Sequence, residues 1–324
     1  MHERHIRLGS LTARLLLPDE RYGHDVAQIF GTSLQAPDWA PVAGIGAEIA
    51  FEERPGGRAD SGPQVPMDGM VLMHDPLRPE IHTEALSLYL NLDIHPARIR
   101  LDVVRLDLPH FDLCVHLAVA FHKLLFLMDR VVLHGAAISV DDKVCLFLGD
   151  KGAGKSTIAL KLARAGGTVL GEDHLILRRT GDGFVVSGCD ERSRLTAKTE
   201  EFFFDDPLDI VPKDFAGTMK KEVPAGELFT SVPYTDGPVT HLFFPKVGNR
   251  LLPARLSRKE LLLELMRATG KLQRFVDLAD RTRFLELLAA FTPSVEGYRL
   301  ELSEDLADLD DLVTFVRALP ARGS

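Results

Sequence analysis

An eight-residue segment in the middle of the chain constrains the fold more than any other feature. Residues Gly149–Ser156 read GDKGAGKS and match GxxxxGK[ST] at every fixed position. The apolar run Val144–Leu148 precedes the segment, and Gly154–Arg164 follows with apolar residues at helical spacing. A strand, a glycine-rich loop and a helix in this order predict a phosphate-binding loop in an α/β domain, whereas the alternative is a glycine-rich turn without a ligand.

This segment has the residue types that nucleotide phosphates require. Its glycines let backbone N–H groups converge on phosphate oxygens, and the following helix points its positive end at them. Lys155 is placed to reach the β and γ phosphates and Ser156 to bind Mg²⁺. The expected nucleotide-binding residues are Gly149, Asp150, Lys151, Gly152, Ala153, Gly154, Lys155, Ser156 and Thr157.

A histidine is expected beside this loop. The runs Val131–Val140 and Lys143–Leu148 are separated by two aspartates, the spacing of a two-residue hairpin. If Val140 faces Lys143, His134 lies opposite Gly149. His134 is then either a core histidine or a group that orients a carboxylate, polarises a phosphate oxygen or passes a proton.

An acidic pair follows the next short strand. Thr168–Gly171 is expected beside the loop's strand, with Glu172 and Asp173 at its carboxyl end, where ligands of α/β sheets bind. One acid would hold Mg²⁺ and the other would accept the proton of an attacking hydroxyl. The alternative is an exposed turn.

Together these residues resemble a known family. Leu133-His134-Gly135, GDKGAGKST and Gly171-Glu172-Asp173 are similar in order and spacing to the catalytic core of HPr kinase/phosphorylase and its relatives, over Val131 to about Leu177. The resemblance implies a phosphotransferase that uses ATP and Mg²⁺, with a mixed sheet and a fold similar to phosphoenolpyruvate carboxykinase.

The resemblance also implies roles for individual residues. Lys155 and the loop glycines would hold phosphates, Ser156 and Asp173 the metal, Glu172 would be the base, and His134 would support it. The family commonly has two aspartates at the acidic pair, so the longer Glu172 shifts the base or exchanges the two roles. The glycine-rich signature that follows the core in HPr kinases is not recognisable, so HPr is not the expected acceptor.

The chain divides into two expected domains. Residues 1–108 form a smaller β-rich domain, with strands at Ile6–Leu17 and Gly44–Phe51 and a mobile loop at about 53–69. The boundary is expected near Pro109, before a long helix. Residues 109–324 form the HPr-kinase-like P-loop domain of α/β class, with helices near its end at Arg258–Ala268, Thr282–Phe291 and Leu306–Leu319.

Composition excludes several classes of function. The formal net charge of −9 disfavours nucleic acid as a partner, because phosphate backbones need a cationic face. No apolar stretch resembles a signal peptide or a membrane span, and the three cysteines lack metal-ligand spacing, so we expect a cytoplasmic protein without membrane partners. Whether it forms a homo-oligomer stays open.

These patterns predict a kinase that transfers the γ-phosphoryl group of ATP to a hydroxyl, with a serine of a peptide or protein favoured. A kinase of a small metabolite and a nucleotide-gated binding module are the alternatives. The candidate substrate-binding residues are Arg192, Arg194, Lys220 and Lys221, whose charge suits phosphate or an acidic acceptor, although solvated surface charge explains them equally well.

Overall fold

The chain forms two compact units, Met1–Val131 and Val132–Ser324. Helix α2 (His110–Leu127) packs against helix α1 (Glu20–Ile29), so the division falls after this helix rather than near Pro109. The computed structural model describes residues 1–36, 46–54, 65–67, 70–73, 80–82, 86–91, 94–103, 110–181, 183–214, 217–230, 232, 234–269 and 278–321.

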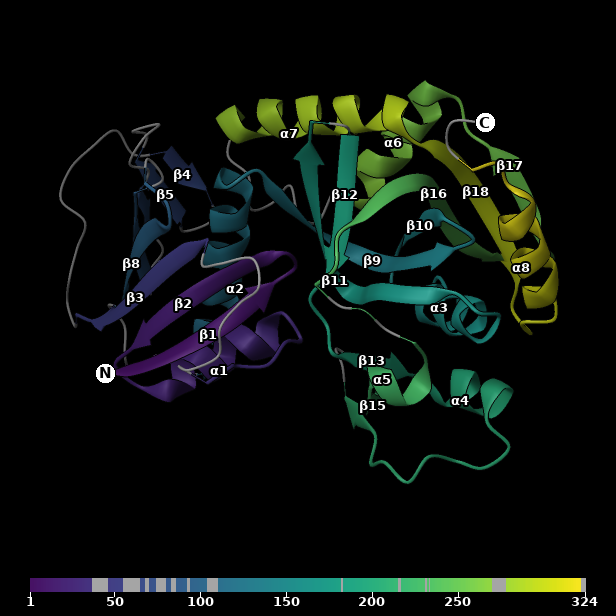
Figure 1. Ribbon diagram of the computed structural model, residues 1–324, viewed down its shortest axis with the longest axis horizontal. Coiled ribbons are helices and arrows are strands. Elements are labelled where there is room, and N and C mark those ends of the chain that lie inside the picture. The colour runs from purple at the N-terminus through teal and green to yellow at the C-terminus, as the bar shows by residue number, and fades with distance from the viewer. Residues whose placement is uncertain are drawn as a thin grey trace. The chain divides into compact units, whose positions relative to one another are not determined.

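The first unit is built on one eight-stranded sheet, as its β-rich sequence predicts (Figure 1). The alternating run Ile6–Leu17 is a hairpin of two strands, because Gly9 turns the chain with a φ of 58°. Most of the expected loop at 53–69 lies outside the described residues. The strand order is β1 (His2–Leu8), β2 (Leu11–Leu17), β3 (Ala47–Glu53), β8 (Ala97–Val103), β7 (Leu86–Asn91), β6 (Glu80–His82), β5 (Met70–Met73) and β4 (Val65–Met67).

The second unit contains a seven-stranded mixed sheet, which confirms the expected α/β class. Parallel pairs, such as β10 with β16, occur beside antiparallel pairs, such as β9 with β10. The strand order is β10 (Lys143–Leu148), β9 (Arg130–Val140), β11 (Thr168–Thr180), β12 (Gly183–Gly188), β16 (Gly237–Gly248), β18 (Glu296–Ser303) and β17 (Leu252–Arg255), with β10 also paired to β16.

The hairpin before the phosphate-binding loop has the predicted register. Val140 faces Lys143, and the pairing continues to Gly135 opposite Leu148. Asp141 and Asp142 both adopt positive φ, 46° and 62°, which a tight two-residue hairpin turn requires. The last pair of this ladder is Gly135 with Leu148, so His134 on β9 and Gly149 at the start of the loop are the next residues along the two strands.

The strand that carries the acidic pair is not the neighbour of the loop's strand, so this expectation is wrong. Both edges of β10 are already paired, one with β9 and the other with β16. Strand β11 lies instead beyond β9. It also continues to Thr180, so Glu172 and Asp173 lie within a long strand rather than at the end of a short one.

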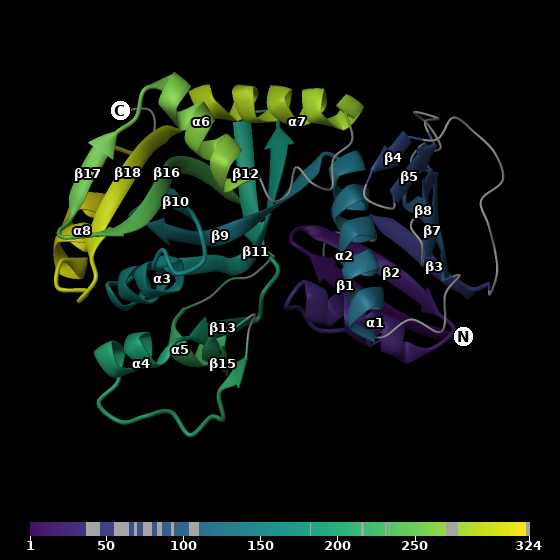
Figure 2. The same cartoon turned by 180° about the vertical axis from the view of Figure 1, so that it is seen from behind.

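Helices cover both faces of this sheet. Helix α3 (Lys155–Arg164) and helix α8 (Leu309–Ala318) share one core with the Phe147 and Phe243 rings, which stack with centroids 4.8 Å apart. Figure 2 shows α6 (Arg258–Ala268) and α7 (Leu278–Phe291) above the sheet and α3 below it. Of the three helices expected near the end of the chain, α6 has the predicted bounds, whereas α7 begins before Thr282 and α8 begins after Leu306.

An insertion between β12 and β16 adds a small three-stranded sheet. Its central strand β15 (Met219–Pro224) pairs with β13 (Arg192–Leu195) and with β14 (Lys213–Asp214), and helices α4 (Ala197–Phe203) and α5 (Ala225–Leu228) flank it. The sequence did not predict this sheet, because its strands are short and charged and lack a regular apolar alternation.

The residue before the acidic pair has no room for a side chain. A Cβ on Gly171 would lie 2.4 Å from the Cα of Gly188 on the neighbouring strand. Gly171→Ala is therefore expected to lower the free energy of unfolding by about 1–3 kcal/mol, since backbone must move. Gly181→Ala is the control, because a Cβ there meets nothing within 4 Å and should change stability by less than about 0.5 kcal/mol. Urea unfolding of both variants measures the difference, and equal midpoints would contradict the packing argument.

Candidate active site at the phosphate-binding loop

At two positions, the loop between β10 and α3 has a backbone conformation that only glycine adopts easily. Gly152 and Gly154 have φ values of 85° and 86°, and Gly154 is the N-cap of α3. A Cβ at either position would meet no atom within 4 Å, so the constraint is conformational rather than steric crowding. The left-handed turns direct the loop around the N-terminus of α3, the end of a helix that attracts anions.

Lys155, the first residue of α3, is held against the loop. Its side chain is 8% exposed, and its ammonium donates hydrogen bonds of 2.9 Å to the carbonyl oxygens of Gly149 and Asp150. The charge therefore lies within the loop that the sequence assigns to phosphate. These bonds hold the lysine at the floor of a pocket.

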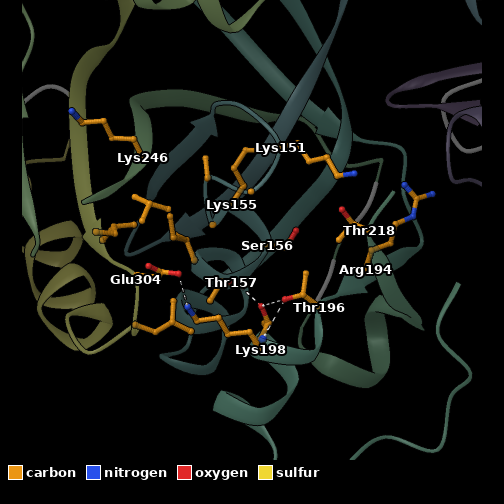
Figure 3. Close-up of a pocket in the computed structure, with 18 of the residues that line it drawn as sticks. Lys151, Lys155, Ser156, Thr157, Arg194, Thr196, Lys198, Thr218, Lys246 and Glu304 are labelled. Atoms are coloured by element: carbon orange, nitrogen blue, oxygen red, sulfur yellow. Dashed lines mark hydrogen bonds and ion pairs between the residues drawn. The ribbon is translucent and has the colours of Figure 1, made fainter. Parts of the chain in front are cut away.

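The pocket has a volume of about 290 Å³ and belongs entirely to the second unit. The loop and α3 form its floor, and Figure 3 shows the side chains that surround them. One wall contains Arg194 from β13 of the inserted sheet and Thr218, the residue before β15. The opposite wall contains Lys246 from β16 and Glu304 after β18.

Asp173 is the member of the acidic pair that lines this pocket. Its φ of 54° breaks the extended backbone of β11 and gives it an orientation different from that of its neighbour. Its Oδ1 lies 3.8 Å from Nδ1 of His134, and its Oδ2 accepts a hydrogen bond of 2.9 Å from Arg194. Burial acts to raise the pKa of Asp173, but the nearby His134 and Arg194 outweigh it and hold that pKa below its ordinary value.

Glu172 lies behind the pocket wall. Its side chain is 5% exposed, and one carboxylate oxygen accepts a hydrogen bond from the Ser193 hydroxyl. The other oxygen, Oε1, is buried without a regular hydrogen-bond partner among the described residues. Burial raises the pKa of Glu172 to about 7, while the Ser193 bond and the nearby Ser156 hydroxyl act to lower it. The neighbouring Asp173 acts in the same direction as burial.

His134 lines the pocket beside Asp173, and it follows the hairpin ladder at the start of the loop, where the register predicts it. Half of its side chain, 52%, is exposed. Desolvation by the surrounding protein and repulsion from Lys155 nevertheless lower its pKa to about 4. His134 is therefore neutral at pH 7, so at that pH Arg194 is the charged partner of Asp173, and His134 is a neighbouring polar group.

Strand β13 contacts the acidic pair with two consecutive side chains. Ser193 donates to Glu172, and Arg194 donates to Asp173. Both contacts span 21 residues of sequence, so they exist only because the inserted sheet folds back on β11. Sequence reasoning missed Ser193, since a serine in a short charged strand has no distinguishing signal.

A second buried pair follows the acidic pair. The imidazole of His174 lies 3.1 Å from a carboxylate oxygen of Asp190, and the His174 backbone N–H donates to the other oxygen at 2.6 Å. Burial disfavours charge on His174, but the Asp190 carboxylate outweighs burial and raises the pKa of that histidine. This pair was also missed, and it ties β11 to the chain that leads into β13.

The four candidate substrate residues occupy different positions. Arg194 and Lys220 line the pocket. Arg192 lies outside the pocket lining and pairs with Glu222 at 3.5 Å. Lys221 is also outside it, and its ammonium donates to Glu200 and to the Leu208 carbonyl, at 2.7 and 2.6 Å. The pocket therefore brings together two of the four.

The residues at the loop fit a magnesium ion, although no group of three His, Cys, Asp or Glu side chains suited to a metal occurs in the described part of the chain. Mg²⁺ in nucleotide sites takes a hydroxyl, one or two carboxylates, phosphate oxygens and water. The Ser156 hydroxyl lies close enough to the Glu172 carboxylate to lower its pKa, and among the described residues Oε1 of Glu172 has no partner in regular hydrogen-bond geometry. Ser156 and Glu172 would hold the ion, and Asp173 lies beside them at the pocket surface.

The bond from Ser193 can be tested separately. Ser193→Ala removes a donor that favours the charged form of Glu172, so the pKa of Glu172 is expected to rise above about 7. Carboxyl ¹³C chemical shifts followed against pH measure this change. Ser294→Ala, which removes a hydroxyl bonded to the Phe291 carbonyl, is the control and should leave the titration of Glu172 in place. An unchanged titration in Ser193→Ala would contradict the assigned contact.

No family model matches the chain, and no curated protein matches it. A solved structure, the HPr(Ser) kinase/phosphatase from Coxiella burnetii, is similar over 57% of this chain and 93% of its own, at 12% sequence identity and a TM-score of 0.29. In the described residues, no helix is long and apolar enough to cross a membrane.

Proposed function

We propose that the protein is an ATP- and Mg²⁺-dependent kinase that transfers the γ-phosphoryl group to a hydroxyl, with a serine of a peptide or protein as the leading acceptor. The observation that carries this proposal is the position of Asp173 and His134 in the same pocket as the phosphate-binding loop. A protein that only holds nucleotide needs the loop but not a carboxylate aimed into the pocket.

In the proposed reaction, the acceptor oxygen bonds to the γ phosphorus as the bond from phosphorus to the β,γ-bridging oxygen breaks. ADP leaves, and the hydroxyl proton passes to a carboxylate. Lys155 and the backbone N–H groups of the loop would bind the phosphate oxygens. Bound Mg²⁺ supplies positive charge to the phosphates.

We assign the proton acceptor to Asp173 and the metal side to Glu172 with Ser156, which exchanges the roles that the family resemblance implies. Access supports this assignment, because Asp173 lines the pocket whereas Glu172 is 5% exposed and lies behind it. A general base must first be within reach of its proton, and the pKa matters second. The lowered pKa of Asp173 keeps it ionised at pH 7.

The test is consumption of ATP by the purified protein with Mg²⁺, alone and with pooled peptides or pooled metabolites. Asp173→Asn is expected to abolish acceptor-dependent ADP formation while retaining nucleotide binding, because the proton has no acceptor. Glu172→Gln is expected to raise the Mg²⁺ concentration needed for half-maximal rate. Asp206→Asn, an exposed acid outside the pocket lining, is the control.

Three outcomes bear on the proposal. Turnover that rises only with an acceptor and disappears in Asp173→Asn supports it, and the responding pool identifies the acceptor class. Tight ATP binding without transfer in any pool favours a nucleotide-gated binding module. Absence of nucleotide binding would mean that the loop does not bind phosphate.

A further inference from the structure

The pocket is strongly cationic in an acidic protein. The chain has a net charge of −9, yet the side chains that line the pocket include six cations and two carboxylates. Such an excess of one sign in a concave site attracts ligands of the opposite sign. The cations are Lys151, Lys155, Arg194, Lys198, Lys220 and Lys246, and the carboxylates are Asp173 and Glu304.

Most of these cations are already engaged or belong to the phosphate-binding loop. Lys198 lies 3.8 Å from Glu304, and Lys246 lies 2.7 Å from Glu301. Figure 3 shows Lys246 and Glu304 on the side of the loop away from Arg194. Arg194 itself is paired with Asp173 and lies 3.5 Å from Glu222.

Lys220 differs from the other cations. It is half-buried and lines the pocket, and within the described residues its ammonium has no hydrogen bond or ion pair at 4 Å or less. It lies two residues before Glu222 on β15, on the same face of that strand, and Glu222 is the register partner of Arg194, which bonds Asp173. The strand register therefore places Lys220 toward the Asp173 end of the pocket, and its charge also helps to lower the pKa of Asp173. Thr218, two residues before Lys220, also lines the pocket and appears on the same side of the loop as Arg194 in Figure 3.

The acceptor hydroxyl must come within hydrogen-bond reach of Asp173 to lose its proton there. A group next to that hydroxyl therefore lies near the Lys220 ammonium. A half-buried ammonium without a carboxylate partner is better stabilised by an anionic ligand group than by a neutral one, because charge-assisted bonds are the stronger ones.

We infer that the acceptor carries a carboxylate or phosphate group next to its reactive hydroxyl and that Lys220 binds this anionic group. The inference rests on the proposed kinase function, because that function makes this pocket the acceptor site. It concerns the charge of the acceptor rather than the transfer step. It makes Lys220 a specificity-determining residue.

The experiment measures binding without requiring transfer. Fluorescein-labelled nonapeptides with one serine flanked by aspartates or by asparagines are titrated with the full chain, Mg²⁺ and a non-hydrolysable ATP analogue. Glycerate and glycerol, compared by calorimetry, form the small-molecule arm. The acidic member of at least one arm is expected to bind about tenfold more tightly than the neutral member, the usual effect of one charge-assisted bond.

Matched variants assign this preference to one side chain. Lys220→Gln is expected to remove the preference. Lys213→Gln is expected to keep it, because Lys213 faces Lys220 across the β14 and β15 pair but is 64% exposed and lies outside the pocket lining. Analogue binding and unfolding midpoints of both variants establish that each remains folded.

The outcomes separate this inference from the proposed function. Equal binding of acidic and neutral probes, no binding of either acidic probe, or equal losses in the two variants would overturn the role of Lys220. A preference in one arm only would identify a peptide or a small hydroxy acid as the source of the charge. A preference without phosphorylation of the bound probe would support the inference while the proposed kinase function fails.

Discussion

Lys155→Ala is expected to reduce acceptor-dependent ADP formation by at least about 10³-fold, which corresponds to about 4 kcal/mol of lost transition-state stabilisation. The ammonium of Lys155 is held within the loop by the carbonyl oxygens of Gly149 and Asp150, so it requires no ordering when phosphates arrive. Alanine removes the charge and leaves the loop glycines in place.

The measurement is the initial rate with saturating ATP, Mg²⁺ and the responding acceptor pool. Lys161→Ala on the same helix is the control, because Lys161 pairs with Asp310 at 2.6 Å and lies outside the pocket lining. It should retain the wild-type rate within a few-fold. Full turnover in Lys155→Ala would remove the basis for the proposed mechanism.

Glu172→Gln is expected to stabilise the protein at alkaline pH while impairing its activity. Burial raises the pKa of Glu172 from about 4.5 to about 7, so the folded chain binds a proton more tightly than the unfolded chain. The stability that the protonated form provides is fully present below pH 4.5 and is lost as pH rises through 7. Glutamine stays neutral at every pH and avoids this loss.

The expected size follows from the shift in pKa. A change from about 4.5 to about 7 corresponds to roughly 3 kcal/mol. The free energy of unfolding of Glu172→Gln, minus that of the wild type, should therefore grow by about 3 kcal/mol between pH 4 and pH 8. Urea unfolding in EDTA measures it, since bound metal would stabilise the charged form of the wild type.

Glu200→Gln provides a control of opposite sign. Burial acts to raise the pKa of Glu200, but hydrogen bonds from Lys221 and the Leu208 backbone outweigh it and lower that pKa. Its charge therefore contributes stability that is lost as pH falls, so the glutamine variant should be less stable than the wild type at pH 8. A difference between Glu172→Gln and wild type that does not change with pH would contradict the burial of a titrating carboxylate.

If Glu172→Gln stabilises the protein but lowers its activity, the Glu172 carboxylate serves function rather than stability. Among the residues that the structure describes, Oε1 of Glu172 has no partner in regular hydrogen-bond geometry, and the neighbouring Asp173 repels the charge of Glu172. Neither feature stabilises the fold. Functional sites commonly retain such unfavourable groups because a bound ligand compensates them, and in the proposed function that ligand is Mg²⁺ with nucleotide.

Local patterns in the sequence were sufficient to predict the conformation of the loop Gly149–Ser156 and the register of the hairpin before it. The glycines at 152 and 154 adopt the left-handed backbone that the motif needs, and the two-residue spacing at Asp141 and Asp142 determined the register that brings His134 to the loop. These features depend on residues close together in sequence, where turn geometry and side-chain alternation leave few alternatives.

The sequence by itself therefore determined an α/β unit in which a glycine-rich loop joins a strand to a helix, with a histidine beside the loop and an acidic pair nearby. Only the tertiary structure decided that β11 lies beyond β9, that Asp173 rather than Glu172 lines the pocket, and that Ser193 and Arg194 contact the pair. Strand order depends on which edges are already paired, and the contacts of Ser193 and Arg194 join segments 21 residues apart through an inserted sheet. No local sequence pattern predicts the strand order or these contacts, because both arise from packing between distant parts of the chain.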